Sequence, residues 1–231
     1  MDNEIKKQIV YELIDTFINA GNIALDLRDK GLKKIIKEDN TPVTNGDLEV
    51  NKIITNKIKE ITPQIPIVSE EVSDNKNIEN LSTFWLIDPI DGTYDYLNNR
   101  DEFTLNAGLI INKKPEVAII NAPAKKRLFY TFGMNNSFEI KNKKEIKLDS
   151  GLSSKNSELL ALVYSDNIKD EIKDIHNRYK IKSITKMKSS YKFCVVASGE
   201  FDLYVADPRA SEWDIAAGDA ILRNAGGSVK D

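Results

Sequence analysis

The stretch "WLIDPIDGTYDYL", residues 85–97, places two aspartates directly after an apolar run that is typical of a buried strand. Only a proline and an isoleucine separate Asp88 from Asp91, and Gly92 and Thr93 follow at once. Aspartate, proline and glycine all favour turns, so a plain turn is one interpretation. The alternative is a place where cations and a phosphate meet, because neighbouring carboxylates repel each other unless a positive charge is present.

Composition and charge describe an ordinary globular protein. The chain has 231 residues, of which 41% are hydrophobic and 30% charged, so it is long enough to bury a substantial core. Its formal net charge of -3 lacks the basic surplus of proteins that bind nucleic-acid polymers. The first residues do not resemble a signal peptide, and no stretch is long enough to span a membrane. We therefore expect a cytoplasmic protein.

One cysteine and one histidine limit the available chemistry. Cys194 lies in the apolar run "YKFCVVA", so we expect a packed thiol. His176 lies in the polar run "DEIKDIHNRY", so we expect a solvated helix residue. One cysteine and one histidine are too few for a typical zinc site or for a Ser-His-Asp or Cys-His triad. Carboxylates, hydroxyls and backbone groups must therefore carry out any reaction.

Hydrophobic spacing in residues 1–145 predicts two amphipathic helices followed by a largely antiparallel sheet. The first helix carries Ile5, Ile9, Leu13 and Phe17 and ends near Gly31. A polar loop at 33–47 leads into the second helix. Strand-like runs follow at residues 65–69, 84–88, 103–111, 116–122, 127–132 and 137–140.

Strands and helices alternate in residues 146–231, beyond a polar stretch at 141–157. This alternation predicts an α/β half that completes one catalytic unit with the α+β half before it. The strands are expected at 158–165, 182–187 and 201–206. The helices are expected at 167–179, 189–199 and 211–227.

Acidic residues collect at the ends of the predicted elements, where side chains can point into one cleft. They are Asp47, Glu70, Glu71, Asp88, Asp91 and Asp214. An all-oxygen ligand set selects hard cations such as Mg²⁺, and the carbonyl of Ile90 could add a ligand. Each acidic position also has a structural interpretation: Asp47 can form a capping box with Thr44, Asp214 can complement its helix dipole, and the glutamates can end a solvated strand.

The residues after Asp91 predict an anion site. "TYDYLNN" is expected to begin a short helix at Thr93, and the N–H groups of Gly92 and Thr93 would then face outward at its N-terminus. Two carboxylates and a phosphate cradle within one segment indicate metal-assisted hydrolysis of a phosphate ester.

These motifs resemble the inositol monophosphatase superfamily of Mg²⁺-dependent, typically lithium-sensitive phosphatases. The resemblance rests on "DPIDGT", an upstream "SEE" and a downstream "WDIAAGDAILRNAGG", and extends from "TPVTNGD" to the last residues. It implies a layered αβαβα sandwich. "NNRDEFTLNAGLI" and "SSYKFCVVASGEFDLY" are similar to the 3'(2'),5'-bisphosphate nucleotidases, which hydrolyse adenosine 3',5'-bisphosphate to AMP and phosphate. Inositol monophosphatase or sugar-bisphosphate phosphatase activity is the alternative, and a non-catalytic phosphate-binding relative comes third.

The resemblance also assigns roles in metal binding, for two or three Mg²⁺ ions. Glu70, Asp88 and the Ile90 carbonyl would hold one ion, and Asp88, Asp91 and Asp214 a second. Glu70 would help to place a third and so belongs with the catalytic residues.

Catalytic and binding roles follow from the same resemblance. Asp47 would accept a hydrogen bond from the Thr93 hydroxyl, and this pair would activate the attacking water. The N–H groups of Gly92 and Thr93 would bind the scissile phosphate. The residues expected to face the rest of a small phosphorylated substrate are Ser189, Ser190, Asp207, Arg209 and Asp214.

The sequence departs from the family pattern in three places. Lys188 stands where relatives often have a glycine, and Arg209 would replace an arginine that nucleotidases carry nearer the tyrosine. For Asp207 and Arg209, ordinary loop solvation is the alternative. Relatives usually continue beyond "GGSVKD", so the last sheet is expected to lack an edge strand or to have it covered by a partner, and a homodimer is one such arrangement.

Overall fold

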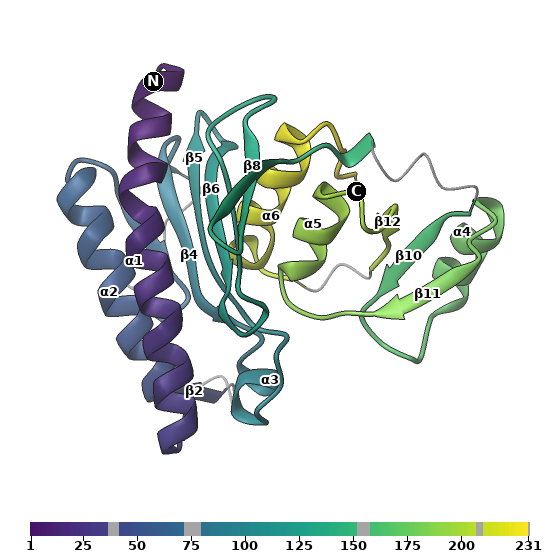
Figure 1. Cartoon of the computed structure of the whole chain (residues 1–231), viewed down its shortest axis with the longest axis horizontal. Helices are drawn as coiled ribbons and strands as arrows, with labels where there is room; N and C mark the ends of the chain where they lie inside the picture. The colour runs from purple at the N-terminus through teal and green to yellow at the C-terminus, as the bar shows by residue number, and fades with distance from the viewer. Residues whose placement is uncertain (37–41, 72–79, 152–157, 207–209, 231) are drawn as a thin grey trace.

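Two long helices cover one face of a seven-stranded sheet in this computed structural model (Figure 1). The structure describes residues 1–36, 42–71, 80–151, 158–206 and 210–230. Asp2 caps the first helix by accepting a hydrogen bond from the Ile5 N–H at 2.9 Å, and the helix ends at Gly31. The two helices are α1 (Asn3–Lys30) and α2 (Asn45–Ile61).

The seven strands follow one another in chain order, and only the first pair is parallel. The prediction of a largely antiparallel sheet is therefore confirmed. The strands are β3 (Ile67–Ser69), β4 (Phe84–Asp91), β5 (Thr104–Ile111), β6 (Lys114–Ala122), β7 (Arg127–Thr131), β8 (Ser137–Lys141) and β9 (Lys144–Lys147). A 3₁₀ turn, η2 (Pro123–Lys125), joins β6 to β7.

Three short strands lie where the sequence predicted polar loops. β1 (Lys34–Ile36) and β2 (Pro42–Thr44) form an antiparallel pair within the predicted loop at 33–47. β9 lies within the polar stretch at 141–157 and crosses the predicted boundary at residue 145. All side chains of β1 and β9 are exposed, so no buried face gives these strands an alternating pattern. The division at residues 145 and 146 stays a prediction.

A second sheet is parallel, as the alternation in the second half predicted. Its order is β11-β10-β12, and it consists of β10 (Leu160–Val163), β11 (Ser183–Lys186) and β12 (Leu203–Tyr204). Two helices pack between the sheets, and one apolar core joins them to Ile120 of β6 and Leu162 of β10. They are α5 (Tyr191–Ala197) and α6 (Glu212–Asn224). With α4 (Asp170–Arg178) outermost, the layers form the αβαβα sandwich (Figure 1).

The two residues that limited the chemistry are both buried. The prediction for Cys194 is confirmed, and burial raises the pKa of its thiol. The prediction for His176 is wrong, because its side chain is only 4% exposed. Ile172 precedes His176 by four residues, so these two side chains share a face of α4, and Ile172 and Ile175 are both partly buried. His176 therefore lies on the covered side of the helix despite the polar run around it. Neither imidazole nitrogen has a hydrogen-bond partner among the described residues.

A helix that crosses a membrane needs about 20 consecutive, mainly apolar residues. Within the described ranges, no helix combines the length and the apolar character that a membrane crossing needs.

Candidate active site

A β-bulge in β4 turns Asp88 and Asp91 towards the same side of the sheet. Asp88 pairs with Asn106 and Asp91 with Thr104, so three steps along β4 match two along β5. Two residues that are three positions apart in a regular strand point to opposite faces of the sheet. The bulge adds one residue to β4 between Asp88 and Asp91, so these two side chains point to the same face. Ile90 accordingly packs into the core beneath α1 and α2. The predicted strand end at Asp88 is therefore wrong: β4 continues through the bulge to Asp91.

Three aspartates from β4 and α6 come together at this bulge. Asp88, Asp91 and Asp214 each offer a carboxylate oxygen within 4.8 Å of the others. Burial, followed by the charges of Asp91, Glu70 and Asp214, raises the pKa of Asp88 well above its ordinary value. Burial and the charge of Asp91 also raise the pKa of Asp214. Glu70, directly after β3, also forms a hydrogen bond with Asp88 that adds to this shift.

The oxygen atoms of this cluster fit a hard cation. Asp88 is 1% exposed, and its Oδ1 has no hydrogen-bond partner within the part of the chain that the structure describes. Carboxylates packed this closely cannot all stay ionised without a compensating positive charge. A divalent ion bound by oxygen ligands would supply it, so the cluster could hold a metal ion.

Ser190 holds Asp91 from the side of α5. Its backbone N–H and its hydroxyl both donate to Oδ2 of Asp91, the hydroxyl at 2.6 Å. The Ser190 hydroxyl oxygen also lies 2.7 Å from the backbone oxygen of Asp214 and accepts a 3.0 Å hydrogen bond from Asn106. Ser190 is fully buried, so it supports the aspartates from behind. Its predicted contact with substrate stays a prediction.

Asp47 serves its helix and faces Thr93 at the same time. Its Oδ2 accepts a 2.8 Å hydrogen bond from the Thr44 N–H, which closes the capping box of α2. Its Oδ1 lies 3.3 Å from the Thr93 hydroxyl, which is also 3.2 Å from the carbonyl of Ile90. Burial raises the pKa of Asp47, although hydrogen bonds from Thr44 and Thr93 oppose the shift. Asp47 therefore both caps α2 and contacts Thr93.

Asp214 has the same double position at the start of α6. Its Oδ2 accepts a 2.8 Å hydrogen bond from the Ser211 N–H and completes a capping box. The carboxylate reaches the cluster from the third residue of the helix, the position that Asp47 occupies in α2.

Gly92 makes the turn between β4 and the short helix α3 (Thr93–Leu97), which confirms the predicted helix start. Its φ is +94°, in the left-handed region that favours glycine. A Cβ atom here would lie 2.9 Å from the carbonyl oxygen of Glu102, so any other residue would also clash with the backbone. Its own carbonyl accepts hydrogen bonds from the N–H groups of Asp95 and Tyr96.

Only some of the residues expected to recognise the rest of the substrate lie in the described part of the chain. Asp207 and Arg209 lie outside the described residues. Ser189 lies beside the cluster and has a φ of +52°, so the left-handed residue in this loop is the serine and Lys188 needs no glycine-like backbone. Lys188 instead pairs with buried Asp95, at 3.4 Å from Nζ to Oδ2.

A cavity of about 1270 Å³ adjoins the cluster. Asp91, Asp214 and Ser189 contribute to its lining, together with three residues that the sequence argument missed: Tyr164, Lys192 and Tyr204. The two tyrosines could have been found, because each lies within the last three residues of a predicted strand in the α/β half.

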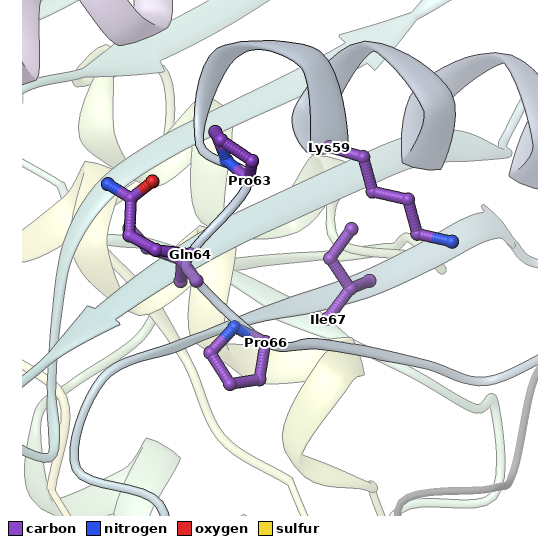
Figure 2. Close-up of a pocket in the computed structure, with 6 residues that line it drawn as sticks. Lys59, Pro63, Gln64, Pro66 and Ile67 are labelled. Carbon is purple, nitrogen blue, oxygen red and sulfur yellow. The ribbon is translucent and has the colours of Figure 1, made fainter.

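A second hollow, of about 440 Å³, lies between the end of α2 and β3 (Figure 2). None of the predicted site residues lines it. Its lining consists of Lys59, Pro63, Gln64, Ile65, Pro66 and Ile67.

Two bacterial 3'(2'),5'-bisphosphate nucleotidases are similar to this chain along most of its length. A 3'(2'),5'-bisphosphate nucleotidase CysQ of Buchnera aphidicola is 36% identical over 233 residues, covering 99% of this chain and 86% of the relative. The CysQ of Escherichia coli K12 is 30% identical over 217 residues, covering 92% of this chain and 86% of the relative.

Two solved structures have a similar fold. CysQ from Bacteroides thetaiotaomicron, a bacterial member of the inositol monophosphatase family, superposes with a TM-score of 0.72 at 26% identity, covering 96% of this chain and 87% of that one. The SuhB protein of Bartonella henselae shares the fold, with a TM-score of 0.77 at 21% identity over 97% of this chain and 87% of that one. The model of the inositol monophosphatase family matches residues 5–231, and the chain belongs to that family.

Proposed function

We propose that the chain is a Mg²⁺-dependent phosphomonoesterase that hydrolyses adenosine 3',5'-bisphosphate to AMP and phosphate. One observation carries the reaction type: the carboxylates of Asp88, Asp91 and Asp214 gather within 4.8 Å beside the Asp47–Thr93 pair. The substrate rests on relatives that are 30–36% identical and are named 3'(2'),5'-bisphosphate nucleotidases.

Five groups would hold the metal in this proposal: Glu70, Asp88, the Ile90 carbonyl, Asp91 and Asp214. Two or three Mg²⁺ ions bound there would neutralise phosphate charge and make water more acidic. The Oδ1 of Asp88 supports this assignment, because it is buried and none of the described residues forms a hydrogen bond with it. Lithium would inhibit by competing for the same oxygens.

The chain's own residues would then position the reactants. The hydrogen bond to Asp47 turns the Thr93 hydroxyl so that its oxygen can accept a hydrogen from the attacking water, with the carboxylate as the final proton acceptor. The N–H groups of Gly92 and Thr93 would hold the scissile phosphate. The water oxygen would bond to phosphorus as the bond to the ribose 3'-oxygen breaks, and that oxygen would take up a proton from solvent as it leaves. Ser190 keeps Asp91 in place throughout.

A substitution of Asp91 tests the reaction type. We expect Asp91→Asn to abolish phosphate release from adenosine 3',5'-bisphosphate while the circular dichroism spectrum and melting temperature stay close to those of the wild type. The matched control is Asp166→Asn, since that side chain is 82% exposed and lies outside the cluster. Unchanged turnover in Asp91→Asn would contradict the proposed reaction.

Side-by-side assays separate the substrates. Inositol monophosphate and a sugar bisphosphate belong in the same phosphate-release assay as the nucleotide, because the matching model is that of the whole inositol monophosphatase family. Mg²⁺ binding measured by calorimetry, with no turnover of any phosphate ester, would point instead to a non-catalytic relative. A cytoplasmic location and a homodimer stay predictions that fractionation and analytical ultracentrifugation can test.

A further inference from the structure

Two polar residues of β5 lie directly opposite the aspartates of β4. Thr104 is the cross-strand partner of Asp91, and Asn106 is the cross-strand partner of Asp88. Opposite residues of an antiparallel pair project from the same face of the sheet. Leu105, between the two polar residues, belongs to the core beneath α1 and α2. Thr104 and Asn106 therefore project from the other face, which α6 covers.

Buried polar atoms without a partner are concentrated in these two cross-strand pairs. Six buried side-chain nitrogen or oxygen atoms in the described part of the chain have no hydrogen-bond partner. Three of them are Oδ1 of Asp88, Oγ1 of Thr104 and Oδ1 of Asn106, and each of these side chains is 1% exposed or less. A buried polar atom that stays unpaired destabilises a fold, so this concentration points to a polar ligand between the strands and α6.

The side-chain amide of Asn106 is oriented by its neighbours. Its Nδ2 lies 3.0 Å from Oγ of Ser190 and 3.5 Å from Oδ2 of Asp91. An ionised carboxylate oxygen only accepts hydrogen bonds, so the nitrogen end of the amide must face it. Oδ1 of Asn106 is therefore directed away from these two residues.

The nitrogen end of Asn106 supports two aspartates that come from different elements. The Ser190 hydroxyl that it contacts donates to Asp91 at 2.6 Å and lies 2.7 Å from the backbone oxygen of Asp214. Asp91 ends β4, whereas Asp214 lies in the first turn of α6. The loss of Asn106 would therefore loosen the contact that holds these two residues near each other.

The oxygen end of Asn106 needs a donor that its cross-strand neighbours do not supply. Asp88 lies opposite, and an ionised carboxylate offers only acceptors. The Thr104 hydroxyl has a single hydrogen, which cannot serve both remaining acceptors. Mg²⁺ usually keeps several of its water molecules when it binds to protein carboxylates, and each water brings two hydrogens. A hydrated cation at the aspartates would thus provide the missing donors.

We propose that Asn106 is a positioning residue for the divalent cation. Its nitrogen end fixes Ser190 against Asp91, and its oxygen end accepts a hydrogen bond from the water shell of the ion. This inference rests on the metal site of the proposed function and extends that site to a residue that touches neither the phosphate nor the ion. Residues that orient metal ligands in this way change metal affinity about 10- to 100-fold.

Calorimetric titration with Mg²⁺ alone tests the inference without any substrate. We expect Asn106→Leu, which has nearly the same shape but neither donor nor acceptor, to raise the Kd for Mg²⁺ about 10- to 100-fold. The matched control is Asn121→Leu in β6. Asn121 is also buried, at 5% exposure, and its Nδ2 donates to the Phe17 carbonyl of α1 at 2.7 Å. The control loses a buried hydrogen bond as well, but the Kd should stay within about twofold because the site is remote.

The Mg²⁺ dependence of phosphate release gives a second measurement. Asn106→Leu should need about 10- to 100-fold more Mg²⁺ than the wild type to reach half of its maximal rate. The KM for adenosine 3',5'-bisphosphate at saturating Mg²⁺ should stay within about twofold, because Asn106 does not touch the nucleotide. A merely structural role of Asn106 would not separate these two quantities.

An unchanged Kd for Mg²⁺ in Asn106→Leu, or an equal rise in Asn121→Leu, would overturn the inference. If Asn106→Leu does not fold, Asn106→Ala, whose smaller side chain cannot clash, takes its place and should show a rise of at least about tenfold. A wild type that binds Mg²⁺ but hydrolyses no phosphate ester would contradict the proposed function alone, and the calorimetric comparison would still decide the role of Asn106. A wild type that does not bind Mg²⁺ would overturn both.

Discussion

The two sheets of this molecule differ in how deeply they are buried. In the seven-stranded sheet, seven of the eight residues in each of β4 and β5 are buried, between α1 and α2 on one face and α6 on the other. In the three-stranded sheet, all four residues of β11 are exposed and both residues of β12 are only partly buried. The deep sheet fixes Asp88 and Asp91, whose accurate placement the proposed metal site requires. The thin sheet supplies the tyrosines of the cavity, where a bound ligand needs room.

The largest effect is expected where the two regions meet, at Arg127 of β7. Its guanidinium pairs with Glu139 at 2.5 and 3.0 Å and donates to the hydroxyl of Tyr191, in the first turn of α5, at 2.7 Å. Arg127 and Glu139 side chains are each 6% exposed. Arg127→Met would leave a buried carboxylate without its partner, which costs about 3–5 kcal/mol of unfolding free energy. Urea titration followed by circular dichroism measures the loss.

The control for Arg127 is a double variant. Adding Glu139→Gln to Arg127→Met removes the buried stranded charge and leaves only Glu200, whose side chain is 45% exposed, without the arginine, so it should restore most of the lost stability. A loss below about 1 kcal/mol in the single variant would show that the buried Arg127–Glu139 pair, which links β7 to β8 within the deep sheet, contributes little to stability.

A matched pair of isoleucines compares the sheets directly. Ile119 of β6 is fully buried, whereas Ile184 of β11 is 44% exposed. Ile119→Val should cost about 0.5–1.5 kcal/mol of unfolding free energy, because it removes a packed methylene group. Ile184→Val should stay within about 0.5 kcal/mol. Valine is β-branched like isoleucine, so both substitutions leave the preference of the residue for a β-strand nearly unchanged. Equal losses by urea titration would mean that the thin sheet is covered more tightly than its exposure indicates.

The smallest effect is expected from the titration of His176 in α4. Burial lowers its pKa below the ordinary 6.5, so the unfolded chain takes up the proton first as the pH falls. The stability that neutral His176 contributes is complete above pH 6.5 and is lost as the pH falls through the lowered pKa. The melting temperature of the wild type should therefore fall relative to that of His176→Leu from pH 7.5 to pH 5. Parallel curves would show that the histidine is protonated equally in the folded and unfolded chain.

Much of this architecture could be predicted because burial leaves a periodic pattern. The long helices, the strands of the deep sheet and the alternation of the second half all have apolar faces, and the "DPIDGT" motif located the acidic cluster. The bulge in β4 could not be predicted in the same way, since one extra residue leaves an apolar strand unchanged in composition. His176 was misjudged because its charged neighbours occupy the opposite face of a single short helix. Lys192 was missed because a lysine near apolar residues has no distinctive pattern.

Asp47 and Asp214 each begin a helix with one oxygen and face the candidate site with the rest of the carboxylate. The two residues proposed for the site are therefore also the residues that cap α2 and α6. A chain in which either helix has not yet formed also lacks a complete cluster, so a partly folded molecule cannot hydrolyse nucleotides in the cell. Activity in this protein would then report on completed folding of both helices.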